Sequence, residues 1–211
     1  MVIVLLMACT GSGGKTAEGS GVAGTVSASG FEGGGAVSAD VSTGAAFGVN
    51  TGGEAVLVLT PNADATCADA ASWLLGDDED WSPEAIIPEG TCGLYVRGAY
   101  EGSLSVEDDA TAVTISLACA MDTGEWVYEE RDDGDIGWYF DGAWWVGSPD
   151  TFSLSVEGGD DADYDVTLDM DGYSGSFTYD VENPDPDAAT GAVGGNAPAT
   201  WCPDLGPALA R

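Results

Sequence analysis

The side chains best suited to bind a ligand lie between positions 137 and 146, where the chain reads Gly-Trp-Tyr-Phe-Asp-Gly-Ala-Trp-Trp-Val. Exposed aromatic rings beside carboxylates can grip sugars, because each ring combines a large apolar face with a polar edge. Large aromatic pairs across neighbouring strands also stabilise a hairpin without any ligand, and we favour that structural role. The candidate ligand contacts are Tyr139, Trp144, Trp138 and Trp145.

The turn of this aromatic hairpin is predicted at Asp141-Gly142, a dipeptide typical of two-residue type I′ turns. In that register, alternation along each strand divides the rings between two faces. We expect one set to fill the core and the other to be covered by a loop or exposed. One face carries Trp138, Phe140 and Trp145, and the other carries Tyr139 and Trp144.

Acidic side chains are the second group that could do chemistry. The chain has 37 Asp and Glu residues and no His, which excludes His-based triads and His-ligated metals. Two carboxylates roughly 5–10 Å apart can hydrolyse a glycosidic bond, but among so many acids some pair meets that distance by chance. No Gly-x-Ser-x-Gly sequence marks a nucleophilic serine. We therefore expect no enzyme activity, and carboxylate-pair glycoside hydrolysis is the only enzyme class that the residues permit.

One acidic segment resembles a fragment of the calcium loops in which Asp or Asn recurs at every second position. It reads Asn183-Pro-Asp-Pro-Asp187, which makes Asp185 and Asp187 the candidate metal ligands. Ala188 occupies the position where such loops need Gly, and the prolines favour an extended linker. We expect no cofactor, with Ca²⁺ as the one ion that these oxygen atoms could hold.

The formal net charge is −33, because the acids are opposed by only four Lys and Arg residues. Nucleic acid and anionic membrane surfaces are bound through basic patches, so neither is an expected partner of this surface. Self-repulsion costs stability unless ions screen it. The screening length falls from about 8 Å at physiological salt to about 3 Å at 1 M. We hypothesise a saline habitat or bound divalent cations, and favour a simple solubilising surface over specific metal binding.

The start of the chain is a short apolar run that ends in Leu6-Met7-Ala8-Cys9. These four residues resemble the lipobox of bacterial lipoproteins, although no Lys or Arg precedes the run, a gap that an upstream start codon would explain. The resemblance implies cleavage before Cys9, acylation of that residue and anchoring in a membrane. Thr10 after the cysteine, in place of Asp, resembles lipoproteins sorted to an outer membrane. A buried N-terminal strand is the alternative.

The lipobox also accounts for the odd number of cysteines, which is five. Without Cys9 an even set is left in a chain that we expect to be exported, so disulfides are predicted. Three connectivities are possible, and we prefer Cys67–Cys92 with Cys119–Cys202. By parity, Cys92 and Cys119 should both face the core.

Alternation of apolar and polar residues predicts strands with one buried face. It is clearest at residues 113–119 and 164–170, and each run follows a copy of Ser-Leu-Ser-Val-Glu, at 103–107 and 153–157. The repeat is either a duplication or a coincidence. In the second run Tyr164, Val166, Leu168 and Met170 should be buried, opposite a carboxylate stripe formed by Asp163, Asp165 and Asp169.

Other segments complete the predicted fold. Residues 54–60 are apolar on both parities, as in a central strand covered on both faces. Residues 22–49 are rich in Gly, Ala and Ser and suggest edge or loosely packed strands. Thr66 and Asp69 form a capping box that predicts a short helix near 67–75. The expected fold is all-β, an antiparallel β-sandwich of roughly ten short strands, with a partly closed β-barrel as the alternative.

The predicted organisation is a signal peptide at 1–8, a flexible Gly/Ser tether at 9–21 and a single all-β domain at 22–205. The predicted function is that of a lipid-anchored, non-catalytic envelope protein, exported and held at the outer membrane, whose acidic body is a structural or interaction module. Its partners would be the membrane, through the lipid, and an envelope polysaccharide or protein. The alternative is a module that binds carbohydrate, or another ligand with the help of Ca²⁺, through the aromatic hairpin.

Overall fold

The computed structural model describes residues 21–29, 36–75, 81–130, 136–159, 163–179 and 188–210. The helical elements are α1 (Cys67–Leu75) and two 3₁₀ helices, η1 (Pro83–Ala85) and η2 (Pro203–Ala210). The strands are β1 (Gly21–Ser29), β2 (Ala36–Ser42), β3 (Ala45–Thr51), β4 (Glu54–Thr60), β5 (Thr91–Ala99), β6 (Ser103–Glu107), β7 (Val113–Glu130), β8 (Ile136–Gly158), β9 (Tyr164–Tyr179) and β10 (Ala188–Trp201). The all-β prediction and the position of the helix are confirmed.

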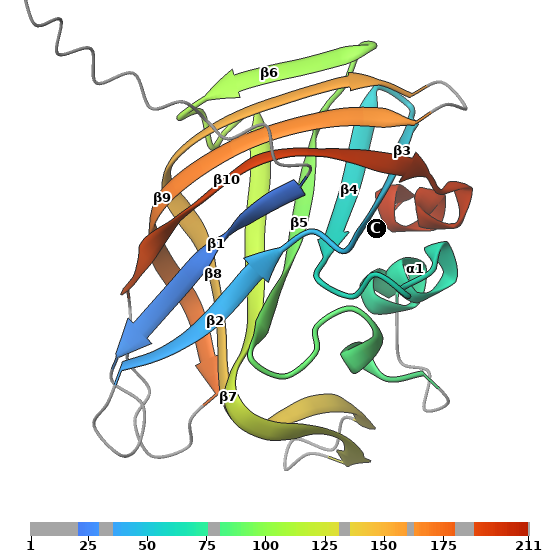
Figure 1. Ribbon diagram of the computed structural model, residues 1–211. Helices are drawn as coiled ribbons and strands as arrows, with labels where there is room; N and C mark the ends of the chain where they lie inside the picture. Colours follow the sequence, from blue (N-terminus) through green and yellow to red (C-terminus); the bar gives the residue numbers. More distant parts are fainter. Residues whose placement is uncertain are drawn as a thin grey trace, which may run out of the picture.

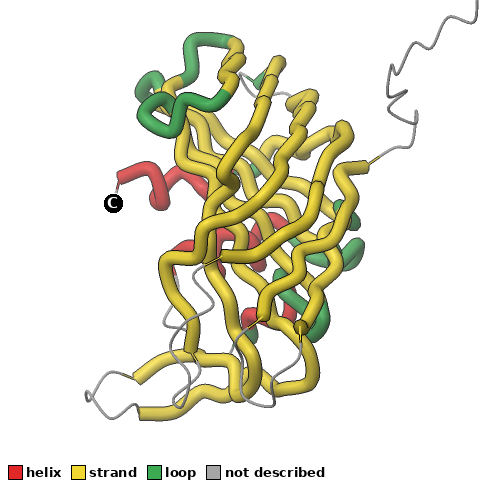
Figure 2. The backbone as a smooth tube through the Cα atoms, turned by 90° about the vertical axis from the view of Figure 1, so that its left-hand side faces the viewer, coloured by secondary structure: helices red, strands yellow, loops and turns green. Residues whose placement is uncertain are grey.

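Seven strands form a closed circuit of hydrogen-bonded pairs in the order β1, β2, β5, β7, β8, β9 and β10, which returns to β1 (Figure 1). The circuit is antiparallel except for a two-residue parallel contact between β2 and β5. The β3–β4 hairpin lies outside it, pairing with β10 and β5, and β6 pairs with β8. The strands run obliquely across the body. The C-terminal end of β7 and the N-terminal end of β8 project from it as a two-stranded arm (Figure 2).

The prediction of edge or loosely packed strands is wrong for the Gly-rich strand β1, whereas β2 and β3 each have one fully paired edge and only a two-residue parallel contact on the other. β1 pairs with β2 on one edge and with β10 on the other. Small residues permit this seam: Gly191 has φ +137°, and a Cβ there would lie 2.0 Å from the carbonyl oxygen of Thr25. Glycine is required where two backbones approach so closely.

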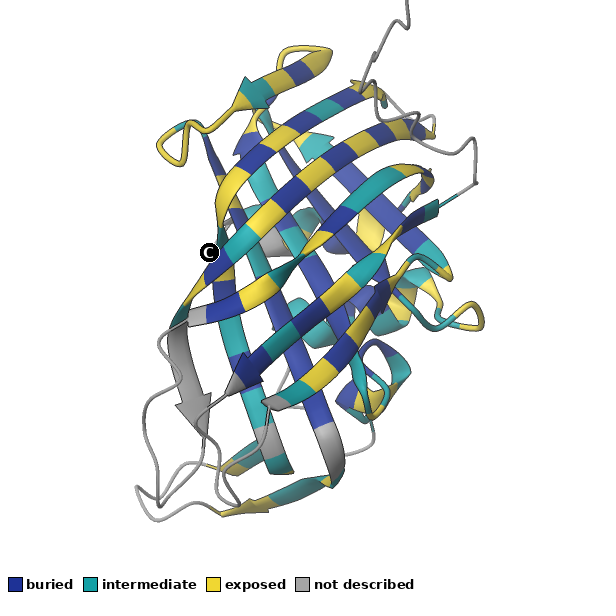
Figure 3. Cartoon of the chain, turned by 60° about the vertical axis from the view of Figure 1, so that its left-hand side comes forward, coloured by how far each residue is buried: buried dark blue, intermediate teal, exposed yellow. Residues whose placement is uncertain are grey.

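An interior core fills the space enclosed by the strands, and burial alternates along them (Figure 3). On β9 the alternation follows the prediction: Tyr164, Val166, Leu168 and Met170 are buried, while Asp163 just before the strand and Asp165 and Asp169 on it are exposed. The inward-facing side chains therefore stabilise the circuit chiefly by removing apolar surface from water.

A second core lies on the outer side of β3, β4, β5 and β7, under α1, η1 and η2. Strand β4 contributes to both cores, with Leu57 facing inward and Val56 and Val58 facing the helices. Its predicted coverage on both faces is confirmed. Helix α1 begins with the predicted capping box, in which the Asp69 amide donates to Thr66 Oγ1 at 3.2 Å and the Thr66 amide donates to Asp69 Oδ2 at 2.8 Å.

The four predicted disulfide cysteines form two disulfides, but the preferred connectivity is wrong. The pairs are Cys67–Cys202 and Cys92–Cys119. Cys92 and Cys119 both face the interior core, as parity predicted, and they are direct partners across β5 and β7. Cys67 and Cys202 belong to the second core, so neither of the preferred pairs is formed.

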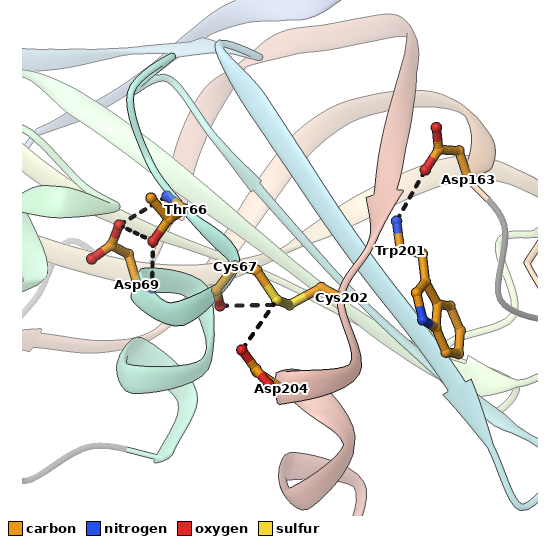
Figure 4. The surroundings of a disulfide bond; sticks show 7 residues. All are labelled: Thr66, Cys67, Asp69, Asp163, Trp201, Cys202 and Asp204. Atoms are coloured by element: carbon orange, nitrogen blue, oxygen red, sulfur yellow. Dashed lines mark hydrogen bonds between the residues drawn. A yellow bond between two sulfur atoms is a disulfide. The ribbon is translucent and has the colours of Figure 1, made fainter.

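The Cys67–Cys202 disulfide joins the start of α1 to the start of η2 (Figure 4). Asp204 Oδ2 lies 3.7 Å from Cys67 Sγ, a contact without a shared proton because an oxidised sulfur carries none. Arg97, the one cation among the described residues, lies near the far end of η2, where it donates to the carbonyl oxygen of Leu209 at 3.2 Å and to Glu54 at 2.8 Å. The C-terminal segment is thus tied to the body at both ends.

Candidate functional site

The aromatic segment belongs to a longer hairpin than predicted. Strand β8 passes through Asp141 and Gly142 without a break, so the predicted turn at these residues is wrong. Trp126 lies opposite Phe140, and the register shifts between Met121 and Glu125, where extra β7 residues face Gly142. Glycine is common at such bulges. The continuous strand is favoured because it pairs with both β7 and β9, whereas a short hairpin would pair mainly with itself.

The distribution of the rings over the two faces also differs from the prediction. Trp145 is fully buried in the interior core, whereas Phe140 and Trp144 lie together in the outer core. Without a turn, alternation along one strand places even-numbered residues on one face. Trp138 accordingly contacts Tyr128 of β7, not Trp145. The side chain of Tyr139 lies outside the described residues.

Trp126 is the centre of the outer aromatic cluster. Its ring lies 5.4 Å from that of Phe140 and 5.0 Å from that of Trp144, both in edge-to-face contacts. Its indole Nε1 donates to the carbonyl oxygen of Ile87 at 3.0 Å, which fixes the 81–90 segment against the sheet. Sequence reasoning missed this residue as part of the candidate site, although Trp126 and Tyr128 alternate along β7 as Phe140 and Trp138 do along β8.

This arrangement limits what the aromatic residues can do. Trp126 packs edge-to-face against Phe140 and Trp144, which are themselves tilted relative to each other. This packing stabilises the outer core and leaves no coplanar platform for a sugar ring. Trp145 is fully buried and out of reach of any external ligand. Further along the arm, Trp138 and Tyr128 lie with ring centroids 5.3 Å apart, and both side chains are partly exposed. Three of the four predicted ligand-contact residues have described side chains, and Trp138 is the best placed of these to contact a ligand.

The outer face of β6, β8 and β9 is polar, as the predicted carboxylate stripe implied. Asp165 lies beside Glu157, and Asp169 beside Ser153. A shallow groove of about 390 Å³ crosses the end of this face. It is lined by Glu107, Asp108, Thr151, Phe152, Ser153, Asp169, Met170, Asp171 and Ala192. Asp108, at φ +50°, accepts the Phe152 amide proton at 2.6 Å, so this carboxylate holds the groove's backbone in place.

The described part of the chain contains no cluster of side chains that could form a metal site. No group of three or more Asp, Glu, Cys or His side chains there is placed to hold an ion. The candidate ligands Asp185 and Asp187 lie outside the described residues, as does the acidic run at 77–80. Ca²⁺ binding at those positions stays a prediction.

Among the described residues, two carboxyl groups have pKa values that depart clearly from their usual range, and both pKa values are lowered. Partial burial alone would raise the pKa of Asp69, but hydrogen bonds from the side chain and amide of Thr66 and from Trp81 outweigh it. Hydrogen bonds from Thr111 lower the pKa of Asp109. A general acid in glycoside hydrolysis needs the opposite shift. These two groups therefore serve as structural caps.

The interior core contains two buried polar atoms without a hydrogen-bond partner among the described residues, Trp145 Nε1 and Tyr173 Oη. Their rings lie 6.1 Å apart in edge-to-face contact. Burial, together with the charge of Asp171, raises the pKa of Tyr173. Elsewhere in this core, the Tyr100 hydroxyl lies within hydrogen-bonding distance of the carbonyl oxygens of Gly102 and Gly158, which share its one proton.

The candidate lipid-attachment residue, Cys9, lies outside the described residues. In the described part, no helix combines the length and hydropathy needed to cross a membrane. Comparison with known proteins found no matching family model, no matching curated protein and no matching solved structure.

Proposed function

We propose that this chain is an exported, lipid-anchored and non-catalytic protein of a bacterial envelope, whose acidic β body serves as a structural or interaction module. The observation that carries the proposal is the pairing of cysteines. Four of the five cysteines form two disulfides in the folded body. The fifth is Cys9, which follows Leu6-Met7-Ala8.

The two disulfides and the single remaining cysteine both fit a protein exported from the cytosol. Disulfides persist outside the reducing cytosol, so a body with two of them fits an exported protein. An odd cysteine in an exported protein would be a reactive thiol unless it were modified. Acylation of Cys9 removes that thiol and accounts for the apolar residues before it.

The non-catalytic part of the proposal is supported by the chemistry of the side chains. The chain has no His, and its cysteines in the described body are oxidised. Among the described residues, the carboxyl groups with clearly shifted pKa values are Asp69 and Asp109, and hydrogen bonds from threonines help to lower both pKa values. These features favour a role in binding or scaffolding.

We further propose that the body acts as one closed barrel, not as two separable sheets. Support comes from the seam between β1 and β10, which pair at six positions from Gly21–Asn196 to Ala28–Ala189. In hydrogen exchange, amides along this seam should be protected as strongly as those of the β5–β7 pair. Rapid exchange of the β1–β10 seam alone would favour a sandwich.

The anchor is tested by fractionating a bacterial host that expresses the full chain and two variants. The unaltered chain should sediment with membranes, and Cys9→Ser should move to the soluble fraction while keeping both disulfides. Thr10→Asp, the matched control, should remain membrane-bound and shift toward the inner membrane. A Cys9→Ser protein that still sediments with membranes would overturn the anchor.

A second candidate function, polysaccharide binding, is favoured by the partly exposed pair Trp138 and Tyr128 near the end of the arm. Tryptophan fluorescence titrated with envelope polysaccharides tests it. Trp138→Ala should abolish any response while the protein stays folded, with only a small loss of stability from the missing contact with Tyr128. Trp126→Phe, the control, should keep the response but lose stability with its hydrogen bond to Ile87. No response from the unaltered chain would remove this candidate.

A further inference from the structure

The two copies of Ser-Leu-Ser-Val-Glu pair with each other. One copy is β6, and the other is the 153–157 part of β8. Their antiparallel register is symmetric about Ser105 and Ser155, which lie opposite each other. On either side of this centre, Leu104 pairs with Val156 and Val106 with Leu154. A local two-fold axis therefore relates the two identical pentapeptides.

This register shows that the pentapeptide is complementary to itself. The terminal pairs are Ser103 with Glu157 and Glu107 with Ser153, so each carboxylate faces a hydroxyl and not another carboxylate. The leucine and valine pairs lie on the inward face, where apolar cross-strand pairs stabilise a sheet. Charge, size and polarity are thus matched at every position.

β6 also has a second edge. Among the described strands, β8 is its hydrogen-bonded neighbour, and β6 ends the order of strands in the sheet. It lies at the rim of the molecule (Figures 1 and 3). Ser103, Ser105 and Glu107 are exposed, and Val106 remains partly exposed on the inward face. An exposed strand edge is a template for another strand.

We propose that a second copy of this chain docks on this edge, with the two β6 strands antiparallel and the molecular two-fold axis passing between their Ser105 residues. The register would repeat that of β6 with β8. Leu104 of one copy would face Val106 of the other, and Ser103 would face Glu107. The sheet would continue through both molecules, as in other cases of strand addition.

The contact is weak and depends on salt. Pairing two five-residue strands buries much less surface than the roughly 1,200–2,000 Å² that is buried in stable complexes. Each copy carries a formal charge of −33, so the copies repel each other at low ionic strength. At about 1 M salt, screening shortens the range of that repulsion to about 3 Å. Association should therefore increase with NaCl concentration.

Cysteine trapping tests this geometry in the full chain carrying Cys9→Ser. Adding Ser105→Cys to both copies of the chain places two thiols at the proposed two-fold axis. Ser155→Cys places the thiol at the equivalent position of the other pentapeptide, in β8, which lies one strand further from that axis. Under mild oxidation in 1 M NaCl, Ser105→Cys should form covalent dimers at least tenfold faster than Ser155→Cys, and more slowly in 50 mM NaCl.

Sedimentation velocity of the Cys9→Ser parent supplies the non-covalent readout, and its average mass should rise with concentration in 1 M NaCl. Peptide mapping of each trapped protein should show both native disulfides intact. Equal trapping of the two variants, absence of trapping in both, or a parent that stays monomeric at every concentration and salt would overturn the proposal. None of these results bears on the anchor, which the Cys9 and Thr10 variants test separately.

Discussion

Cys92 and Cys119 lie directly opposite each other on β5 and β7, with their Cα atoms 4.0 Å apart and both side chains in the interior core. This bond differs in setting from Cys67–Cys202, which joins two peripheral helices and has one half-buried partner, Cys67. One disulfide is part of the interior core, and the other fastens the helices to each other on the outside of the sheet.

The two disulfides should differ in their resistance to reduction under native conditions, because thiol exchange requires access to a sulfur. We expect a mild reductant to open Cys67–Cys202 first and to leave Cys92–Cys119 intact until the β body unfolds. Alkylation followed by peptide mapping measures the order. Simultaneous opening of both bonds, or earlier opening of Cys92–Cys119, would contradict this assignment of their roles.

Gly147 is required by the packing of Trp145. A Cβ at Gly147 would lie 2.3 Å from the Trp145 ring and 2.7 Å from the carbonyl oxygen of Ser174. Gly147→Ala should therefore lose about 1–3 kcal/mol of unfolding free energy through overpacking. Gly137→Ala is the matched control on the same strand, because its Cβ would meet nothing within 4 Å. Urea denaturation that gives the two variants equal stability would contradict this packing.

The capping box makes stability depend on acid. Because the folded-state pKa of Asp69 lies below the ordinary value of 3.8, its contribution is complete above that pH and is lost as the pH falls through the folded value. Asp69→Asn should cost about 0.5–2 kcal/mol at pH 7. The gap from the unaltered protein should narrow as the pH falls below 3.8 and the Asp69 carboxyl group becomes protonated in the folded state. Asp165→Asn, an exposed β9 control, should cost less than about 0.5 kcal/mol throughout this pH range.

Salt should stabilise the protein mainly by screening its negative charges. We expect the melting temperature to rise with NaCl. We expect it to rise equally with CaCl₂ at matched ionic strength, because screening depends on ionic strength and not on a specific ion. Differential scanning calorimetry provides the comparison. A much larger response to CaCl₂ would indicate a calcium site and would direct attention to Asp185 and Asp187.

Alternation was a sound guide where a strand kept one face in the core. It predicted the buried and exposed faces of β9 and the inward direction of Cys92 and Cys119. The lack of alternation at residues 54–60 predicted the double coverage of β4. It could not supply register between strands distant in sequence, which is why the preferred disulfide connectivity was wrong. That Cys92 and Cys119 both face the core narrows the choice among the three disulfide connectivities, but only the β5–β7 register places the two cysteines together.

Two further departures have local causes. Asp141-Gly142 has the composition of a turn, yet the pairing available from β7 and β9 keeps β8 extended and uses the glycine opposite a bulge. β10 was not predicted as a strand, because its Gly, Ala and Pro residues have low strand propensity. Those small residues are what allow β1 to approach and close the circuit.

The most direct test of the account is the intact mass of the protein isolated from its native host, measured with the oxidation state of its cysteines. We predict an N-terminus at Cys9 that carries acyl chains, with Cys67, Cys92, Cys119 and Cys202 all oxidised. A protein that retains Met1, carries no lipid and has these four thiols reduced would contradict it.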